Sequence, residues 1–259
     1  MDFTLTKYRE LLSALQTTGY RLLPYNAFLR NTSEEKIAVL RHDVDTKAHA
    51  LEMARQEAEM HIQATYYFRA MPCSWDESLI REIAKLGHEI GYHYESMATC
   101  KGDVDSAYSD FCHHLDELRK IAPVETICMH GSPYSPHNNL DLWKKYDYKS
   151  LDVLGEPYLD TDFTRVFYLT DTGRCWNGGR YSVRDKINSQ QQQWTHKGLR
   201  FHHTSDIIKA LQCQALPSQL LFTVHPQRWT NSYFGWLHQL VWQSTKNQVK
   251  RIIVTTTSR

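Results

Sequence analysis

Short apolar segments that end at charged or imidazole side chains occur repeatedly along this chain of 259 residues. The first segment, Ile37-Ala38-Val39-Leu40, has the length of a buried strand and is followed within five residues by Asp43 and Asp45. Residues 47–60 then return to the apolar spacing of a helix. A strand, a polar turn and a helix in this order form the start of a β/α unit.

The same alternation continues through most of the sequence. It predicts helices over 5–17, 76–86 and 104–121, and strands over 64–68, just before His93, and over 126–129, 166–170, 220–224 and 251–255. Repeated units of this length favour a parallel sheet or barrel. We therefore predict an α/β fold, a distorted (β/α) barrel of about seven parallel strands. It would form a single domain over residues 1–259, with an N-terminal helical extension over about residues 1–35.

Composition narrows the class of partner. The chain has 30 basic and 29 acidic residues, and a net charge of +1 favours neither nucleic acid nor an anionic surface. No run approaches 18 apolar residues and the N-terminus lacks the apolar core of a signal peptide, so we expect a cytoplasmic protein without membrane insertion. Its six cysteines form no Cys-x-x-Cys pair, and we expect them to be reduced and mostly buried.

Polar side chains that follow the predicted strands point to one shared site. The carboxyl ends of parallel strands meet at one edge of a sheet, where loops from different units converge. Polar residues scattered over the surface would have no reason to recur at the ends of strands. The side chains that do so are Asp43, Asp45, His93, His130, Asp171 and His225.

Asp43 and Asp45 are two residues apart, which in extended backbone gives both carboxylates the same face. Two like charges held close raise one pKa unless a cation lies between them. A divalent metal meets that need, with one carboxylate as its ligand and the other as a base. The alternative is a pair of exposed loop aspartates that cap the helix after them.

Two motifs of the chain are Asp43-Val44-Asp45 and Gly87-His88-Glu89-Ile90-Gly91-Tyr92-His93. They resemble an Asp-x-Asp variant of the first motif, and the second motif, of the polysaccharide deacetylase superfamily, also called the NodB-homology family or carbohydrate esterase family 4. The resemblance extends over most of the chain. It implies that Asp43 is the catalytic base and that Asp45 and His93 bind a divalent metal.

The resemblance also implies a second metal-binding histidine four residues after His93, where this chain has Met97. A thioether is a poor ligand for a hard or borderline divalent ion. We propose His130, which follows the strand over 126–129, as the third ligand, with a substrate-binding role as the alternative. Glu95 is the other candidate ligand, and His88 is a weaker one.

Later segments resemble the remaining motifs of the family. Asp171-Thr172-Gly173-Arg174-Cys175-Trp176 is similar to its fourth motif, and the apolar strand that ends at His225 is similar to its fifth. The resemblance implies that His225 protonates the leaving amine. Substrate contacts are predicted at Asp171, Arg174, Trp176 and Ser132, although ordinary surface packing is an alternative for Arg174 and Trp176.

Together, the motifs predict a metal-dependent N-deacylase, a deacetylase or deformylase, that acts on a small-molecule or glycan substrate. The resemblance implies an N-acylated amino sugar. A cytoplasmic location suggests the biosynthesis of a bacterial surface polysaccharide such as a lipopolysaccharide O-antigen. Zinc is the expected metal, with Co²⁺, Ni²⁺ or Mn²⁺ as alternatives. A non-catalytic carbohydrate-binding protein and a cyclic amide hydrolase are the alternative functions, and the sequence gives no indication of the oligomeric state.

Overall fold

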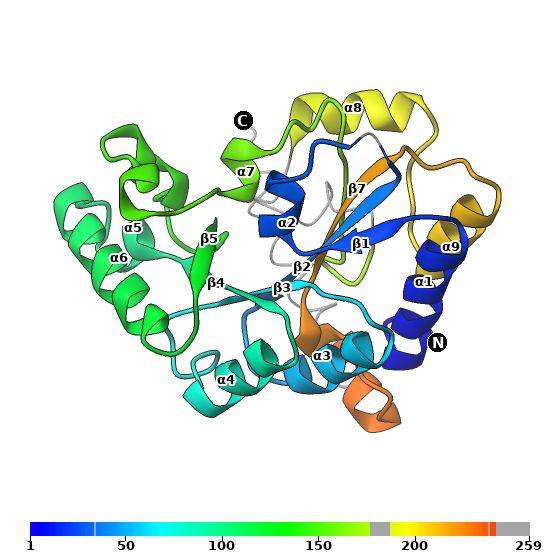
Figure 1. Ribbon diagram of the computed structural model, residues 1–259, viewed down its shortest axis with the longest axis horizontal. Coiled ribbons are helices and arrows are strands. Elements are labelled where there is room, and N and C mark those ends of the chain that lie inside the picture. The colour runs from blue at the N-terminus through cyan, green and yellow to red at the C-terminus, as the bar shows by residue number, and fades with distance from the viewer. Residues whose placement is uncertain (34, 177–186, 238, 242–259) are drawn as a thin grey trace. The chain divides into compact units, whose positions relative to one another are not determined.

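The computed structural model describes residues 1–33, 35–176, 187–237 and 239–241 (Figure 1). Contacts divide the chain into two compact units, each assembled from separate stretches of sequence. The central unit consists of residues 23–32 and 41–161, and the terminal unit consists of residues 1–22, 33–40 and 162–259. Strand β2 (Ile37–Val44) contributes its first half to the terminal unit and its second half to the central unit.

The central unit is built on parallel strands in the order β5-β4-β3-β2. Helices α3, α4 and α6 run along the outside of these strands (Figure 1). The strands are β3 (Thr65–Phe68), β4 (Glu89–Tyr94) and β5 (Val124–Met129), together with the end of β2. The helices are α2 (Tyr25–Leu29), α3 (Ala50–Glu59), α4 (Glu77–Lys85), α5 (Ser96–Thr99), α6 (Val104–Arg119) and α7 (Pro157–Asp160), with 3₁₀ turns at Asn139–Lys144 and Tyr148–Leu151.

Local signals explain where two of these helices begin. The Asp76 side chain accepts a hydrogen bond from the Leu79 amide at the start of α4, and Asp103 accepts one from the Ser106 amide at the start of α6. Such caps satisfy amides that have no partner inside the helix. Because each cap directly precedes an amphipathic helix, both helices were predictable from sequence to within two residues at either end.

Gly91 allows a close approach inside the central unit. A Cβ atom at this position would lie 2.3 Å from Cε1 of Tyr67 and 3.0 Å from the Thr126 carbonyl oxygen. The Tyr67 ring therefore passes over Gly91, and its hydroxyl reaches the Thr126 hydroxyl at 2.9 Å. Only glycine leaves room for the Tyr67 ring at position 91, which is two residues before His93 in β4.

The terminal unit pairs β6 (Phe167–Thr170) with β7 (Gln219–Val224) in parallel. The start of β2 joins them, since the Ile37 amide donates to the Ser218 carbonyl at 2.8 Å. Helix α1 (Leu5–Thr17) packs against α9 (Thr204–Gln212), and the rings of Phe3, Tyr8 and Trp229 pack beside them. The other elements are β1 (Arg21–Leu23), which pairs with β2, α8 (Asn188–His196) and a 3₁₀ turn at Pro226–Arg228.

Seven strands in the described chain, parallel wherever their register is defined, confirm the predicted α/β class, a distorted (β/α) barrel. Strand β1 was not predicted, and the predicted strand over 251–255 lies outside the described residues. Residues 1–35, proposed as an N-terminal helical extension, contain strand β1 as well as helices. Their assignment as an extension of the domain stays a prediction. Strand β2 continues to Val44, so Asp43 lies within the strand rather than in the loop after it.

Two other predictions have clear outcomes. None of the described helices combines the length and apolar character needed to cross a membrane. None of the six cysteines, all of which lie in the described part of the chain, is in a disulfide, but only Cys128 is buried, so the expectation of mostly buried cysteines was wrong. Exposed Cys73 and Cys213 lie outside the regular strands, where a small hydrophobic side chain has no core to enter.

Candidate metal centre

The end of β2 presents a buried ion pair. Arg41 and Asp43 are two residues apart in the strand and therefore face the same side. The Arg41 guanidinium donates to both carboxylate oxygens of Asp43, at 2.8 and 2.7 Å. Burial alone would lower the pKa of Arg41, but the charge of Asp43 raises it above its ordinary value. The pair holds the Asp43 carboxylate ionised and in one orientation.

His93 presents one ring nitrogen toward both aspartates. Its Nδ1 lies 3.0 Å from the Cys128 carbonyl, which accepts its proton. Its Nε2 lies 3.8 Å from Asp43 Oδ2 and 3.9 Å from Asp45 Oδ1. Burial lowers the pKa of His93 to about 4, so the ring is neutral near pH 7 and Nε2 carries a lone pair. A backbone acceptor on one nitrogen is a common way to orient a metal-binding histidine.

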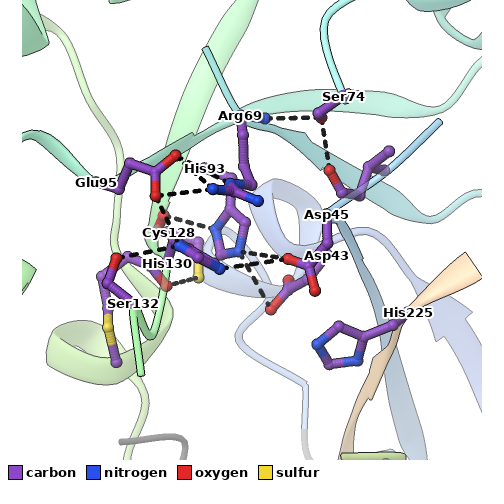
Figure 2. A network of polar contacts seen from close by, with 12 residues as sticks. Asp43, Asp45, Arg69, Ser74, His93, Glu95, Cys128, His130, Ser132 and His225 are labelled. Carbon is purple, nitrogen blue, oxygen red and sulfur yellow. Dashed lines mark hydrogen bonds and ion pairs between the residues drawn. The ribbon is translucent and has the colours of Figure 1, made fainter. Parts of the chain in front are cut away.

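His130 follows β5 and presents its ring in a similar way (Figure 2). Its Nδ1 lies 2.9 Å from Glu95 Oε2 and 3.1 Å from the Ser132 hydroxyl. Its Nε2 lies 3.6 Å from Asp45 Oδ1. The rings of His93 and His130 are 5.2 Å apart and nearly perpendicular. Both imidazoles thus direct Nε2 toward the same carboxylate.

The spacing of these atoms fits a cation. Separations of 3.6 and 3.9 Å are too long for hydrogen bonds. Two ligands at about 2.1 Å from a tetrahedral zinc ion lie about 3.4 Å apart, close to the separation of each imidazole nitrogen from Asp45 Oδ1. Two imidazoles and one carboxylate form a donor set that zinc binds well. The residues predicted as ligands, Asp45, His93 and His130, therefore fit the metal that the sequence implied.

A second set of donor atoms shares His93. Asp43, His93 and Cys128 each offer a ligand atom, and these atoms lie within 4.8 Å of one another. In this set, however, both oxygens of Asp43 already accept hydrogen bonds from Arg41, and the guanidinium charge would oppose a dication. We therefore favour Asp45, His93 and His130.

The other candidates near the second motif have different surroundings. His88 donates from Nε2 to the Ala54 carbonyl at 2.9 Å and accepts from the Ala64 amide at Nδ1, so both nitrogens are in use. Met97 is buried in α5, at 4% exposure. Asp45 does not cap the helix after it, because α3 begins five residues later with His49 at its N-cap.

In the terminal unit, Asp171 holds His225. The Asp171 carboxylate is fully buried and lies 2.6 Å from His225 Nδ1, while its other oxygen accepts from the His225 amide at 3.0 Å. Arg228 and Trp229 donate to the same carboxylate at 2.6 and 2.7 Å. Burial would raise the pKa of Asp171, but Arg228 and His225 lower it below its usual value. Asp171 Oδ1 and Arg228 Nη1 lie 2.6 and 2.8 Å from His225 Nδ1 and hold the ring in one orientation.

The predicted substrate residues differ in exposure. Trp176 is buried, at 2% exposure, and donates from Nε1 to the Thr204 hydroxyl. Arg174 is half-buried, with its guanidinium stacked over Phe3 and Trp236. Ser132 has a φ of 37°, a backbone conformation uncommon outside glycine, and its hydroxyl contacts His130.

Sequence reasoning missed several residues of the site. Arg41 could have been found, because it lies two residues before Asp43 on the same face of a strand. Cys128 could have been noticed in the same way, two residues before His130. Arg69, which donates to Glu95 from β3's end, gave no local signal, because residues 69 and 95 are brought together only by strand pairing.

Comparisons with known proteins give limited similarity. No protein-family model matches the sequence, and no curated protein matches it at a significant level. Among solved structures, the chain is similar to PdaA of Bacillus subtilis, described as a family 4 carbohydrate esterase. The TM-score is 0.41 and the sequence identity 13%, over 91% of this chain and 83% of that chain. The side-chain geometry described above is therefore the basis for assigning a function.

Proposed function

We propose that this protein is a metal-dependent N-deacylase that removes an acetyl or formyl group from an amino sugar. One observation carries the proposal: Nε2 of His93 and Nε2 of His130 face Asp45 Oδ1 at 3.9 and 3.6 Å, beside the Asp43 carboxylate. Three neutral or anionic donors next to an oriented carboxylate supply the parts of a hydrolytic site that uses a metal and a base.

Asp45, His93 and His130 would hold the ion, with zinc as the first expectation. When bound, a divalent ion polarises an acyl carbonyl and acidifies a water molecule. Hydrogen bonds from His93 to the Cys128 carbonyl and from His130 to Glu95 keep Nε2 of each ring available as a ligand. This fixed orientation reduces the rearrangement that ion binding requires.

Asp43 acts as the general base. Its carboxylate removes a proton from the attacking water while the water oxygen bonds to the acyl carbon. Arg41 donates to both carboxylate oxygens, which keeps Asp43 ionised and oriented. Each oxygen has a second lone pair for the incoming proton. The ion pair with Arg41 makes Asp43 a weaker base. A weaker base is sufficient for a water molecule that a bound divalent ion would acidify.

His225 is assigned the proton that the leaving nitrogen needs when the carbon–nitrogen bond breaks. Asp171 accepts from Nδ1 at 2.6 Å and orients the ring, and the proton that passes to the amine is the one on Nε2 of the doubly protonated ring. Products are the free amine and the carboxylic acid. Among the predicted substrate residues, Ser132 and Arg174 are proposed for direct contact, while the buried side chains of Asp171 and Trp176 support their neighbours.

The substrate class comes from the motif resemblance. It suggests an N-acylated amino sugar, and the predicted cytoplasmic location suggests a nucleotide-linked or lipid-linked intermediate of a surface polysaccharide such as an O-antigen.

The test is the substitution Asp43→Asn in protein loaded with zinc. Loss of a general base lowers turnover by about 10²–10⁴-fold, so we expect kcat to fall by this factor while metal content stays stoichiometric. Asp116→Asn, an exposed change on α6, is the matched control and should leave kcat unchanged. The assay uses N-acetyl and N-formyl amino sugars, with imides and ureides in parallel. Full activity of Asp43→Asn, or turnover of the cyclic amides alone, would contradict the proposal.

A further inference from the structure

The position where the resemblance implies a second metal-binding histidine holds Met97, whose side chain is buried in α5. His130 reaches the same carboxylate from a different element, the segment after β5. A histidine on a loop needs support to keep its ring in a ligand orientation, because its side-chain torsions are otherwise free.

Glu95 provides that support. Its Oε2 lies 2.9 Å from His130 Nδ1, and the Ser132 hydroxyl lies 3.1 Å from the same nitrogen. Asn139 donates to the His130 carbonyl at 2.6 Å and to the Ser132 hydroxyl at 3.1 Å. The His130 ring and its backbone are therefore both held, and Nε2 is left as the atom that faces Asp45.

Arg69 in turn fixes Glu95. It donates to Glu95 Oε1 from Nε at 3.0 Å and from Nη2 at 2.7 Å, and to Oε2 from Nη2 at 2.9 Å. Both residues are mostly buried, with side-chain exposures of 15% and 16%. Each oxygen of Glu95 thus has two polar contacts, which makes Glu95 a poor candidate for a direct metal ligand.

We propose that Glu95, held by Arg69, is a positioning residue that enables His130 to replace the ligand lost at Met97. It acts through His130 and does not contact the metal. This inference rests on the metal site of the proposed function, but its readout is metal affinity, which is independent of turnover.

The experiment measures zinc affinity by competition with a chromophoric chelator for the wild type, Glu95→Ala, His130→Ala and the double variant. Loss of a residue that orients a ligand costs about 10–100-fold in metal affinity, so Glu95→Ala should weaken binding by that factor. His130→Ala should weaken binding at least as much. In the His130→Ala background, removing Glu95 should have almost no further effect, because its action passes through the missing ring.

Glu77→Gln on α4, where the side chain is 63% exposed, is the matched control and should bind zinc like the wild type. The visible spectrum of the cobalt-loaded protein gives a second readout, which should change in Glu95→Ala in the same direction as in His130→Ala. Circular dichroism of the metal-free variants checks folding.

Three results would overturn the inference: wild-type affinity in Glu95→Ala, an equal loss on removing Glu95 with and without His130, or no zinc bound by the wild type. The second would make Glu95 a ligand or an independent contributor. Failure of the proposed reaction would be distinct, because the affinities could follow this pattern in a protein that hydrolyses no N-acyl sugar.

Discussion

Two histidine–carboxylate clusters lie on opposite faces of β2. Successive residues of a strand face opposite sides, so Asp43 points one way and His42 the other. We call the first the front cluster and the second the rear cluster. The front cluster consists of Asp43, Asp45, His93 and His130, and the rear cluster consists of His42, Glu57, Tyr66 and His88.

The rear cluster is closed by direct hydrogen bonds. His42 Nε2 lies 2.7 Å from Glu57 Oε1, and the Tyr66 hydroxyl donates to Glu57 Oε2 at 2.7 Å. His42 stacks on Tyr66 with ring centres 4.3 Å apart. Burial lowers the pKa of His88, whose nitrogens bond to backbone groups. These contacts join β2, α3, β3 and the residue before β4 into one network.

In the front cluster, the imidazole nitrogens stand 3.6–3.9 Å from the carboxylate oxygens. These groups are held apart by bonds to other partners, such as Arg41 for Asp43 and the Cys128 carbonyl for His93. Both clusters combine two histidines with carboxylate side chains, so the presence of histidine and carboxylate does not separate them. Donor–acceptor distance does, because bonds near 2.7 Å complete a structural network and wider spacing accommodates a ligand.

The largest expected effect is in the front cluster. Asp45→Asn removes the anionic ligand, and zinc affinity should fall by more than the roughly 100-fold typical of residues that only orient a ligand. The free energy of unfolding of the metal-free protein in urea should change by less than about 1 kcal/mol, because the Asp45 side chain is 26% exposed and asparagine keeps its shape. Metal titration measures the zinc affinity of Asp45→Asn, and urea denaturation of the same variant measures its stability. A loss of stability without a loss of affinity would reverse the roles of the two clusters.

The rear cluster should show the opposite pattern. Glu57→Leu leaves His42 and Tyr66 without their buried partner and should lower the free energy of unfolding by about 3–5 kcal/mol, with zinc affinity unchanged. Glu57→Gln should cost less, because the amide can still bond to both neighbours. Urea denaturation of the zinc-free variants measures the first effect. Should Glu57→Leu weaken zinc binding as much as Asp45→Asn, the distinction between the clusters would fail.

The smallest effect concerns a carboxylate away from both clusters. Burial raises the pKa of Glu89 to about 7, against hydrogen bonds from Thr65, Thr126 and the Asn26 amide that lower it. The folded state thus holds a proton that the unfolded state, in which the pKa of Glu89 is near its ordinary value of 4.5, releases. Protonated Glu89 therefore stabilises the folded state by an amount on the order of 3 kcal/mol. This contribution is fully present below about pH 4.5 and is lost as the pH rises through about 7.

Glu156, whose pKa burial also raises to about 7, contributes in the same direction, so Glu89→Gln should remove only part of the slope. Denaturation at intervals between pH 4.5 and 8 measures it, with the exposed Glu52→Gln on α3 as the control. A slope unchanged by Glu89→Gln would contradict the assignment. Zinc affinity at fixed pH should not change, which separates this carboxylate from the front cluster.

Much of the fold was predictable because each element carries its own pattern. The apolar positions of α1, from Tyr8 to Leu15, are all buried, and the helix begins and ends at the predicted residues. Strand β1 was missed because three residues are too few to show a period of two. Helix α8 was not predicted, because a run of glutamines has no apolar stripe to indicate a helix.

The sequence by itself determined which residues stand at strand ends, because alternation and strand length are local properties of the chain. Asp43, Asp45, His93 and His130 could therefore be named as candidates. Only the tertiary structure decided which nitrogen of each histidine faces the carboxylates, and that Glu95 and Arg69 support His130. Those contacts join residues 26 to 35 positions apart, and strand order and register bring them within bonding distance. A single-residue shift in register would turn the same side chains to the opposite face.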